Sequence, residues 1–280
     1  MSSGARAPKT IQDPSGGLRG PLVVTGTDTG VGKTIVTAAI SAAATAHGLR
    51  VAVVKPGQTG IQGSVAAQST VEPSLEPTAE SDEDTIVRLA APATARTLVT
   101  YPDPLAPLAA ARVAGLMPLN RESVATAVRD LAATHDLVLI EGAGGLLVPM
   151  GAGGWTIADL AVDLAAGLAA DAPGAGAGAS VVVVTRAGLG TLNHTALTLE
   201  ALARRGLQAL VVIGAWPAEP ELVHRTNLAD LPGDLAGVVP DGAAVLAPER
   251  FRASAPAWLA PVLHGDLDPA RFRASGDRAR

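Results

Sequence analysis

Short runs of apolar residues, rich in Val, Leu and Ile, recur along the chain and predict its strands. Several of these runs are continuously apolar rather than alternating, which is typical of strands that helices bury on both faces. The runs are Leu22–Thr25, Val51–Val54, Leu137–Ile140, Val181–Thr185 and Leu210–Ile213. We therefore expect a mostly parallel sheet at the centre of the fold.

Segments with helical periodicity separate these runs. They are Lys33–His47, Arg121–Ala133, Ile157–Leu168 and Leu192–Arg205. Alternation of strands and helices is typical of βαβ units, whose crossovers are right-handed. The pattern predicts a single three-layer α/β domain over residues 21–247, with helices on both faces of the sheet.

Four segments fall outside this alternation. Residues 1–20 are polar, rich in Gly, Ser and Pro, and lack the apolar core of a signal peptide, so we interpret them as a flexible leader. Residues 61–80 and 171–180 are interpreted as mobile loops from their biased composition, although the first of them could instead order over a nucleotide. Residues 248–280 are interpreted as a C-terminal extension without regular structure.

Composition narrows the classes of function. The net charge is −5, from 21 Lys and Arg against 26 Asp and Glu, and no basic patch favours nucleic-acid binding. The chain has no Cys, which excludes disulfides and thiolate metal sites. The lack of Cys favours a cytoplasmic protein. Since no apolar run resembles a membrane span, we expect no membrane partner, and the charge favours no nucleic-acid partner.

The strongest chemical signal is GTDTGVGKT at Gly26–Thr34, between the first predicted strand and the first predicted helix. This is the setting of a phosphate-binding P-loop, although Thr27 stands where the strict pattern has Gly. Glycines let N–H groups converge on phosphates, Lys33 supplies positive charge, and Thr34 supplies a hydroxyl for Mg²⁺. The nucleotide-binding residues expected here are Gly30, Val31, Gly32, Lys33, Thr34 and Ile35. The sequence therefore predicts a P-loop NTPase fold that uses ATP or another NTP.

Two acidic motifs are candidates to complete a magnesium site. Glu141 ends a predicted strand, and Gly142, Ala143 and Gly144 after it let the chain turn close to a ligand. A magnesium-binding carboxylate is expected at such a strand end, with a solvated Glu as the alternative. Asp82 and Asp84 precede a helical pattern, where they are equally explained as partners of the helix dipole.

Lys55 directly follows the second apolar run, in the tight loop Lys55–Gly60. A lysine there could be a surface cation. Its position one strand along from the P-loop favours a role facing an anion at the ligand-binding edge of the sheet.

Taken together, these motifs resemble the dethiobiotin synthetase family, P-loop ATPases of biotin biosynthesis. The resemblance covers about residues 21–245, and its motifs occur in the family's order. They are VTGTDTGVGKT at Val24–Thr34, KPGQTG at Lys55–Gly60, SDED at Ser81–Asp84, EGAGGLLVP at Glu141–Pro149 and LGTLNHTALTLEAL at Leu189–Leu202. The P-loop alone is generic, whereas the last three motifs are specific to the family.

The resemblance implies a ligase that takes up CO₂ on 7,8-diaminononanoate, phosphorylates the carbamate with ATP and closes a ureido ring. The residues it implies to be catalytic are Lys33, Lys55 and Thr29, with Thr34, Asp82 and Glu141 holding Mg²⁺. Thr59 would contact the substrate. In the implied homodimer, the substrate carboxylate would meet a helix start of the partner subunit formed by Gly190, Thr191, Leu192 and Asn193. His194 beside this helix start is interpreted as structural.

The base of the nucleotide is where this chain departs from the family. Many members carry Asn-Asp where Gly214–Pro217 stands here, so the amide that would read adenine is missing and the base preference stays open. The base-side residues implied by the resemblance are Ala215, Trp216, Pro240, Asp241 and Gly242. Trp216 is either a hydrophobic plug or a platform that stacks on the base.

Three other classes compete with this interpretation. A partition or cell-division ATPase would carry a second lysine where Asp28 stands and would bind DNA or membrane. A related amide-forming ligase would normally carry a glutaminase domain with a nucleophilic Cys, and the chain has none. A pure nucleotide-binding module would have no use for Lys55 or for the segment Leu189–Asn193.

Overall fold

The computed structural model describes residues 16–61, 80–171 and 181–277. Apart from their ends, the predicted loops 61–80 and 171–180 lie outside the described residues, as does the predicted leader up to residue 15. In the last part of that leader, Leu18 is buried and Gly20 begins the first strand.

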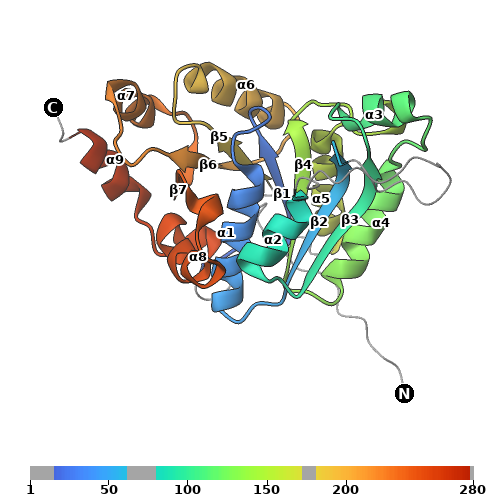
Figure 1. Ribbon diagram of the computed structural model, residues 1–280, viewed down its shortest axis with the longest axis horizontal. Helices are drawn as coiled ribbons and strands as arrows, with labels where there is room; N and C mark the ends of the chain where they lie inside the picture. Colours follow the sequence, from blue (N-terminus) through green and yellow to red (C-terminus); the bar gives the residue numbers. More distant parts are fainter. Residues whose placement is uncertain (1–15, 62–79, 172–180, 278–280) are drawn as a thin grey trace, which may run out of the picture.

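Seven parallel strands form one sheet, in the order β3-β2-β4-β1-β5-β6-β7 (Figure 1). They are β1 (Gly20–Gly26), β2 (Val51–Thr59), β3 (Thr94–Tyr101), β4 (Leu137–Gly145), β5 (Val181–Thr185), β6 (Ala209–Trp216) and β7 (Asp234–Pro240). The five predicted strands are confirmed and hold the five inner places. The two edge strands, β3 and β7, are not among the predicted elements.

Helices cover both faces of this sheet, which confirms the three-layer α/β class. One face carries α1 (Lys33–Ala46), α2 (Asp82–Ala90) and α8 (Pro248–Ser254), and the other carries α3 (Pro107–Ala114), α4 (Arg121–Ala132), α5 (Ile157–Asp171) and α6 (Thr191–Ala203). At the β7 end of the sheet, α7 (Leu222–Asp230) and α9 (Pro269–Asp277) pack together (Figure 1). Short 3₁₀ turns are η1 (Ala152–Gly154), η2 (Ala243–Val245), η3 (Ala255–Trp258) and η4 (Pro261–Leu263).

The core follows from the two-residue period of the strands. Along β4, Leu137 and Leu139 join the cluster beneath α1, whereas Val138 and Ile140 join the cluster on the opposite face. Because aromatic residues make up only 2% of the chain, small side chains must fill this space. Ala38 and Ala39 of α1 are fully buried, and their size lets the helix lie close to the sheet.

The C-terminal residues are folded, contrary to the expectation of an extension without regular structure. Phe251, Leu259 and Leu263 are fully buried and join the core beneath α1. Arg273 of α9 donates hydrogen bonds to carbonyl groups at the end of α7, including that of Leu228 at 2.7 Å. These buried apolar residues anchor the segment. Their irregular spacing shows no helical period, so the sequence pattern did not predict its structure. No helix among the described residues has the length and hydrophobicity needed to cross a bilayer.

The strand order already determines which motifs meet. Strand β4 lies between β1, which leads into the P-loop, and β2, which carries Lys55. The register aligns Val24 with Glu141 and Val54 with Ile140. Since parallel strands end at one edge of the sheet, Glu141 must stand between the P-loop and Lys55.

Candidate active site

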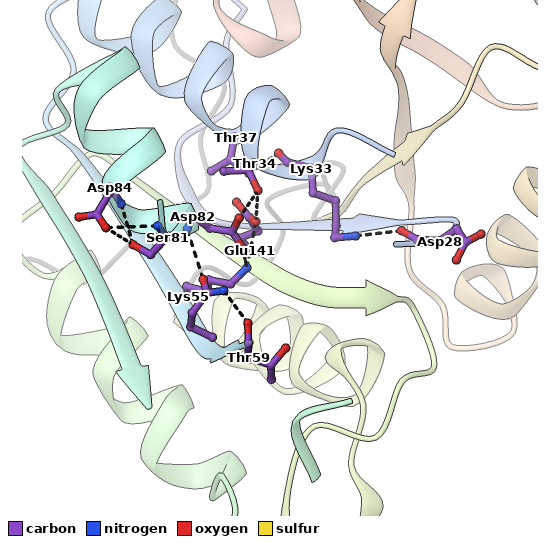
Figure 2. Close-up of polar contacts among 11 residues, drawn as sticks. Asp28, Lys33, Thr34, Thr37, Lys55, Thr59, Ser81, Asp82, Asp84 and Glu141 are labelled. Carbon is purple, nitrogen blue, oxygen red and sulfur yellow. Dashed lines mark hydrogen bonds and ion pairs between the residues drawn. The ribbon is translucent and has the colours of Figure 1, made fainter. Parts of the chain in front are cut away.

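A cavity of about 770 Å³ opens at this edge of the sheet. Its lining comes from the P-loop, the ends of β2 and β4, the start of α2 and the segment before α3. The lining residues are Thr29, Gly30, Gly32, Lys33, Thr34, Ile35, Lys55, Gly57, Gln58, Thr59, Asp82, Pro104, Leu105, Ala106, Pro107, Glu141, Gly142, Ala143, Gly144 and Val148. The cavity therefore joins four of the five motifs singled out from the sequence, and Figure 2 shows their polar contacts.

The P-loop takes its shape from two glycines. Gly30 and Gly32 have φ angles of 71° and 95°, a region that side chains with a Cβ rarely adopt. Gly32 is also the N-cap of α1, and no side chain caps this helix. The N–H groups of its first turn are therefore available to an anion, where the helix dipole adds attraction.

Lys33 projects from the first residue of α1 into the cavity and is largely buried. Its Nζ donates a hydrogen bond to the main-chain carbonyl oxygen of Asp28 at 2.9 Å. Burial lowers the pKa of Lys33, and the attraction of Glu141 and the repulsion of Lys55 act with smaller effects in opposite directions. Phosphate oxygens would satisfy this ammonium better than one carbonyl does.

Lys55 lies deeper, with only 5% of its surface exposed. Its Nζ pairs with the carboxylates of Asp82 and Glu141, the latter at 3.1 Å. Burial alone would lower the pKa of Lys55, but attraction to Glu141 and then to Asp82 outweighs it, so the pKa is raised. The ammonium therefore keeps its charge, and it faces the cavity that the P-loop also lines.

Thr34 connects the two carboxylates. Its Oγ1 lies 3.0 Å from Asp82 Oδ1 and 2.9 Å from Glu141 Oε1. Within the described residues, the other carboxylate oxygen, Glu141 Oε2, is buried without a hydrogen-bond partner. A buried, unpaired carboxylate oxygen beside a second carboxylate and a hydroxyl fits a hard cation.

The three carboxylates of the acidic motif at the start of α2 make different contacts. Ser81 is the N-cap and forms a capping box with Asp84, which confirms the helix-end explanation for Asp84. Glu83 accepts a hydrogen bond from the Thr97 N–H of β3 at 2.6 Å. Asp82 alone turns towards Lys55 and Thr34 (Figure 2). The helix-end explanation therefore holds for Asp84, and Asp82 remains the candidate metal ligand of this motif.

Two groups of predicted residues lie outside this cavity. The segment Gly190–Asn193 forms the start of α6, whose N-cap has no side-chain hydrogen bond. Trp216 packs edge-on against Phe272 and His224, with ring centroids 5.6 and 6.3 Å apart, which favours the hydrophobic-plug interpretation. Asp241 N–H donates to the Trp216 carbonyl at 2.8 Å, so the two predicted base-side segments lie together. Val31 is buried and does not line the cavity.

The sequence analysis did not single out part of the lining. Gln58 accepts a hydrogen bond from Asp82 N–H at 3.3 Å and so helps to place the start of α2. Pro104–Pro107 and Val148 form an apolar wall. Gln58 and Val148 belong to motifs already noted in the sequence. Pro104–Pro107 follow β3, and a prediction of this edge strand beside β2 would have placed them near the cavity.

Gly214 of β6 supports the P-loop from below. A Cβ there would lie 2.0 Å from the Val31 carbonyl oxygen, too close for any adjustment without moving the loop. We expect Gly214→Ala to lower the free energy of unfolding by about 3 kcal/mol and to weaken nucleotide binding. Urea unfolding and calorimetry check both effects. In Gly188→Ala, where a Cβ meets no atom within 4 Å, both quantities should stay near wild type.

Three comparisons with known proteins give matches to this chain. The profile of a family described as an AAA domain matches residues 21–248. The ATP-dependent dethiobiotin synthetase BioD of Streptomyces coelicolor is 49% identical over 92% of this chain and 98% of that protein. The protein of the same name from Rhodococcus jostii is 48% identical over 85% and 94%. The MinC:MinD cell division protein complex of Aquifex aeolicus matches 91% of this chain and 96% of that one, at 14% identity and a TM-score of 0.43, and this match carries no functional weight. The chain belongs to the ATP-dependent dethiobiotin synthetase family.

Proposed function

We propose that this chain converts 7,8-diaminononanoate, CO₂ and ATP into dethiobiotin, ADP and phosphate. The family supplies the reaction, and the cavity supplies groups that suit it. The observation that carries the proposal is the presence of two buried ammonium groups, Lys33 of α1 and Lys55 of β2, in one cavity with the carboxylates of Asp82 and Glu141.

The use of lysine across the chain supports this assignment. Only three of its 21 Lys and Arg residues are lysines, and two of these, Lys33 and Lys55, line the cavity. Arg fills nearly every other basic position. A compact ammonium with rotatable donors is thus kept where point charges must meet a phosphate and a carbamate.

The chemistry needs no nucleophile from the protein. One amine of the substrate adds to CO₂ and loses a proton, which gives a carbamate. A carbamate oxygen attacks the γ-phosphorus, the bond to the β-phosphate oxygen breaks, and ADP leaves. The second amine then attacks the carbamate carbon, closes the ring and expels phosphate. The enzyme positions the two anions and stabilises the charge that develops between them.

Each group in the cavity has a place in this scheme. Lys33 and the N–H groups at the start of α1 bind the β- and γ-phosphates. Lys55 stabilises the carbamate and the transferring phosphoryl group. Thr29 and Thr59 both line the cavity and contact the diamine or the carbamate. The apolar wall of Pro104–Pro107 and Val148 suits a hydrocarbon chain.

Mg²⁺ fits the carboxylate pair. Asp82 and Glu141 carry two negative charges against one positive charge on Lys55, and Glu141 Oε2 is unpaired within the described residues. Two carboxylates and the Thr34 hydroxyl suit an ion that keeps water and phosphate ligands, and among the described residues no larger group of His, Asp and Glu side chains competes for it. When bound, Mg²⁺ neutralises charge on the β- and γ-phosphates.

The remaining assignments extend this proposal beyond one protomer. Gly190–Asn193 lie outside the cavity of their own chain, which suits binding of the substrate carboxylate at the partner subunit's site in a homodimer. The base lies beside Ala215, Trp216 and Pro240–Gly242. None of these side chains is the amide that reads adenine in many relatives, so ATP is tested against the other NTPs. We assign the enzyme to the cytoplasm.

A coupled assay tests the proposed reaction. Purified protein is incubated with the diamine, bicarbonate, Mg²⁺ and each NTP in turn. We expect nucleoside diphosphate and dethiobiotin to form in equal amounts and only when all components are present. Release of nucleoside diphosphate at an unchanged rate without the diamine would rule out the proposed synthetase reaction.

The metal site has its own test. Asp82→Asn is expected to raise the Mg²⁺ concentration for half-maximal activity by about tenfold, because one anionic ligand is lost. Asp84→Asn is the matched control from the same helical turn and should leave this concentration unchanged, since Asp84 caps α2. Equal shifts in both variants would contradict the assignment.

A further inference from the structure

The P-loop contains a carboxylate, Asp28, in a place that must attract phosphates. Asp28 Oδ1 accepts a hydrogen bond from Thr29 N–H at 2.7 Å, and Oδ2 accepts one from Arg186 Nη2 at 2.5 Å. Its carbonyl oxygen accepts the hydrogen bond from Lys33 Nζ. The residue is thus joined to the loop, to the P-loop lysine and to a distant arginine at once.

Hydrogen bonds from two helices hold the turn that carries Arg186. It follows β5 directly, and Asn227 of α7 donates hydrogen bonds to the carbonyls of Ala187 and Gly188, both at 2.9 Å. Before it, the Thr185 hydroxyl lies 2.6 Å from that of Thr191 in α6. The guanidinium therefore reaches the P-loop from a turn that α6 and α7 both fix.

The ion pair between Arg186 and Asp28 is expected to affect nucleotide binding through its charge. An unpaired carboxylate in the loop would repel the triphosphate and could rotate to bind the Lys33 ammonium. The Thr29 hydrogen bond and then Arg186 lower the pKa of Asp28, and His194 adds a weaker attraction, so the carboxylate stays ionised. Both partners are partly exposed, so the pair contributes little to folding. Its effect should appear when a polyanion arrives.

We propose that Arg186 is the counter-ion of the P-loop carboxylate and a positioning residue for nucleotide binding, holding the Asp28 side chain away from Lys33 and from the triphosphate. The proposal rests on the proposed use of a nucleoside triphosphate, but not on the ring-closing reaction.

The test is a double-mutant cycle, measured by calorimetry with Mg²⁺ and AMPPNP and without the diamine. Arg186→Ala should weaken binding by about tenfold, the effect of one uncompensated charge near a polyanion. Asp28→Asn, which keeps the acceptor for Thr29 N–H, should restore most of the affinity when combined with Arg186→Ala. Arg186→Lys should retain most of it, and the loss in Arg186→Ala should shrink in 0.5 M salt, a condition at which screening reaches only about 4 Å. Arg204→Ala, which breaks an exposed pair with Glu200, is the control and should change nothing.

Two results would overturn the inference. Unchanged affinity in Arg186→Ala would show that Asp28 needs no counter-ion. A loss that Asp28→Asn does not restore would show that Arg186 supports the loop structure and not its charge. Because no diamine is present, a chain that binds AMPPNP but makes no dethiobiotin would refute the proposed function and leave this inference standing.

Discussion

Lys55→Ala is expected to lower kcat for dethiobiotin formation by about a thousandfold, while Mg²⁺–AMPPNP binding is kept or strengthened. Lys55 is 5% exposed and faces the cavity, so water replaces its charge poorly where the carbamate meets the γ-phosphate. Its removal would also free Asp82 and Glu141 from their ion pairs, which should favour the proposed binding of Mg²⁺. Rapid-quench measurement of product together with calorimetry separates the two effects.

The control for this prediction is Lys55→Arg. It keeps the charge but replaces a compact ammonium by a planar fork in a buried site, so we expect partial activity. Wild-type kcat in Lys55→Ala would show that Lys55 takes no part in the reaction. Loss of AMPPNP binding in that variant would instead place the residue in nucleotide recognition.

Lys33→Ala should act on the other half of the reaction. We expect nucleotide affinity to fall by roughly a hundredfold or more, since a charge-assisted contact to the β- and γ-phosphates is lost in a largely buried site. Calorimetry with Mg²⁺–AMPPNP measures this loss, and urea unfolding should show a fold of near wild-type stability.

The contrast between the two lysines is itself informative. One variant should lose binding and the other should lose chemistry. Equal loss of nucleotide affinity in Lys33→Ala and Lys55→Ala would contradict the separate roles that we propose for them.

The inner part of the sheet could be predicted from the sequence because its strands are buried on both faces. Val181–Thr185 is wholly buried and entirely apolar before its final Thr. The edge strands could not be predicted in this way. Thr94–Tyr101 mixes polar and apolar residues without a regular alternation, and every residue before Tyr101 is partly or fully exposed. Asp234–Pro240 contains a glycine and ends in proline. An edge strand has a neighbouring strand on one side alone and is less buried, so its hydrophobic pattern in the sequence is weaker.

The site shows a similar division. Strand ends and glycine loops locate Lys33, Lys55 and Glu141, because the topology of a parallel sheet brings such ends together. The local pattern does not separate Asp82 from Asp84, since both suit a helix start, and only the family resemblance singled out Asp82. The capping geometry of Ser81 then shows that Asp84 caps the helix. The link between Asp28 and Arg186, 158 positions apart, depends on folding and has no local signal.

The central claim is that a carbamate oxygen, held beside Lys55, attacks the γ-phosphorus of a nucleotide held by Lys33. The most direct measurement uses CO₂ labelled with oxygen-18 in a short single-turnover reaction, followed by mass spectrometry of both products. The account predicts one labelled oxygen in the released phosphate and one in the ureido carbonyl. A labelled ureido group with unlabelled phosphate would contradict it.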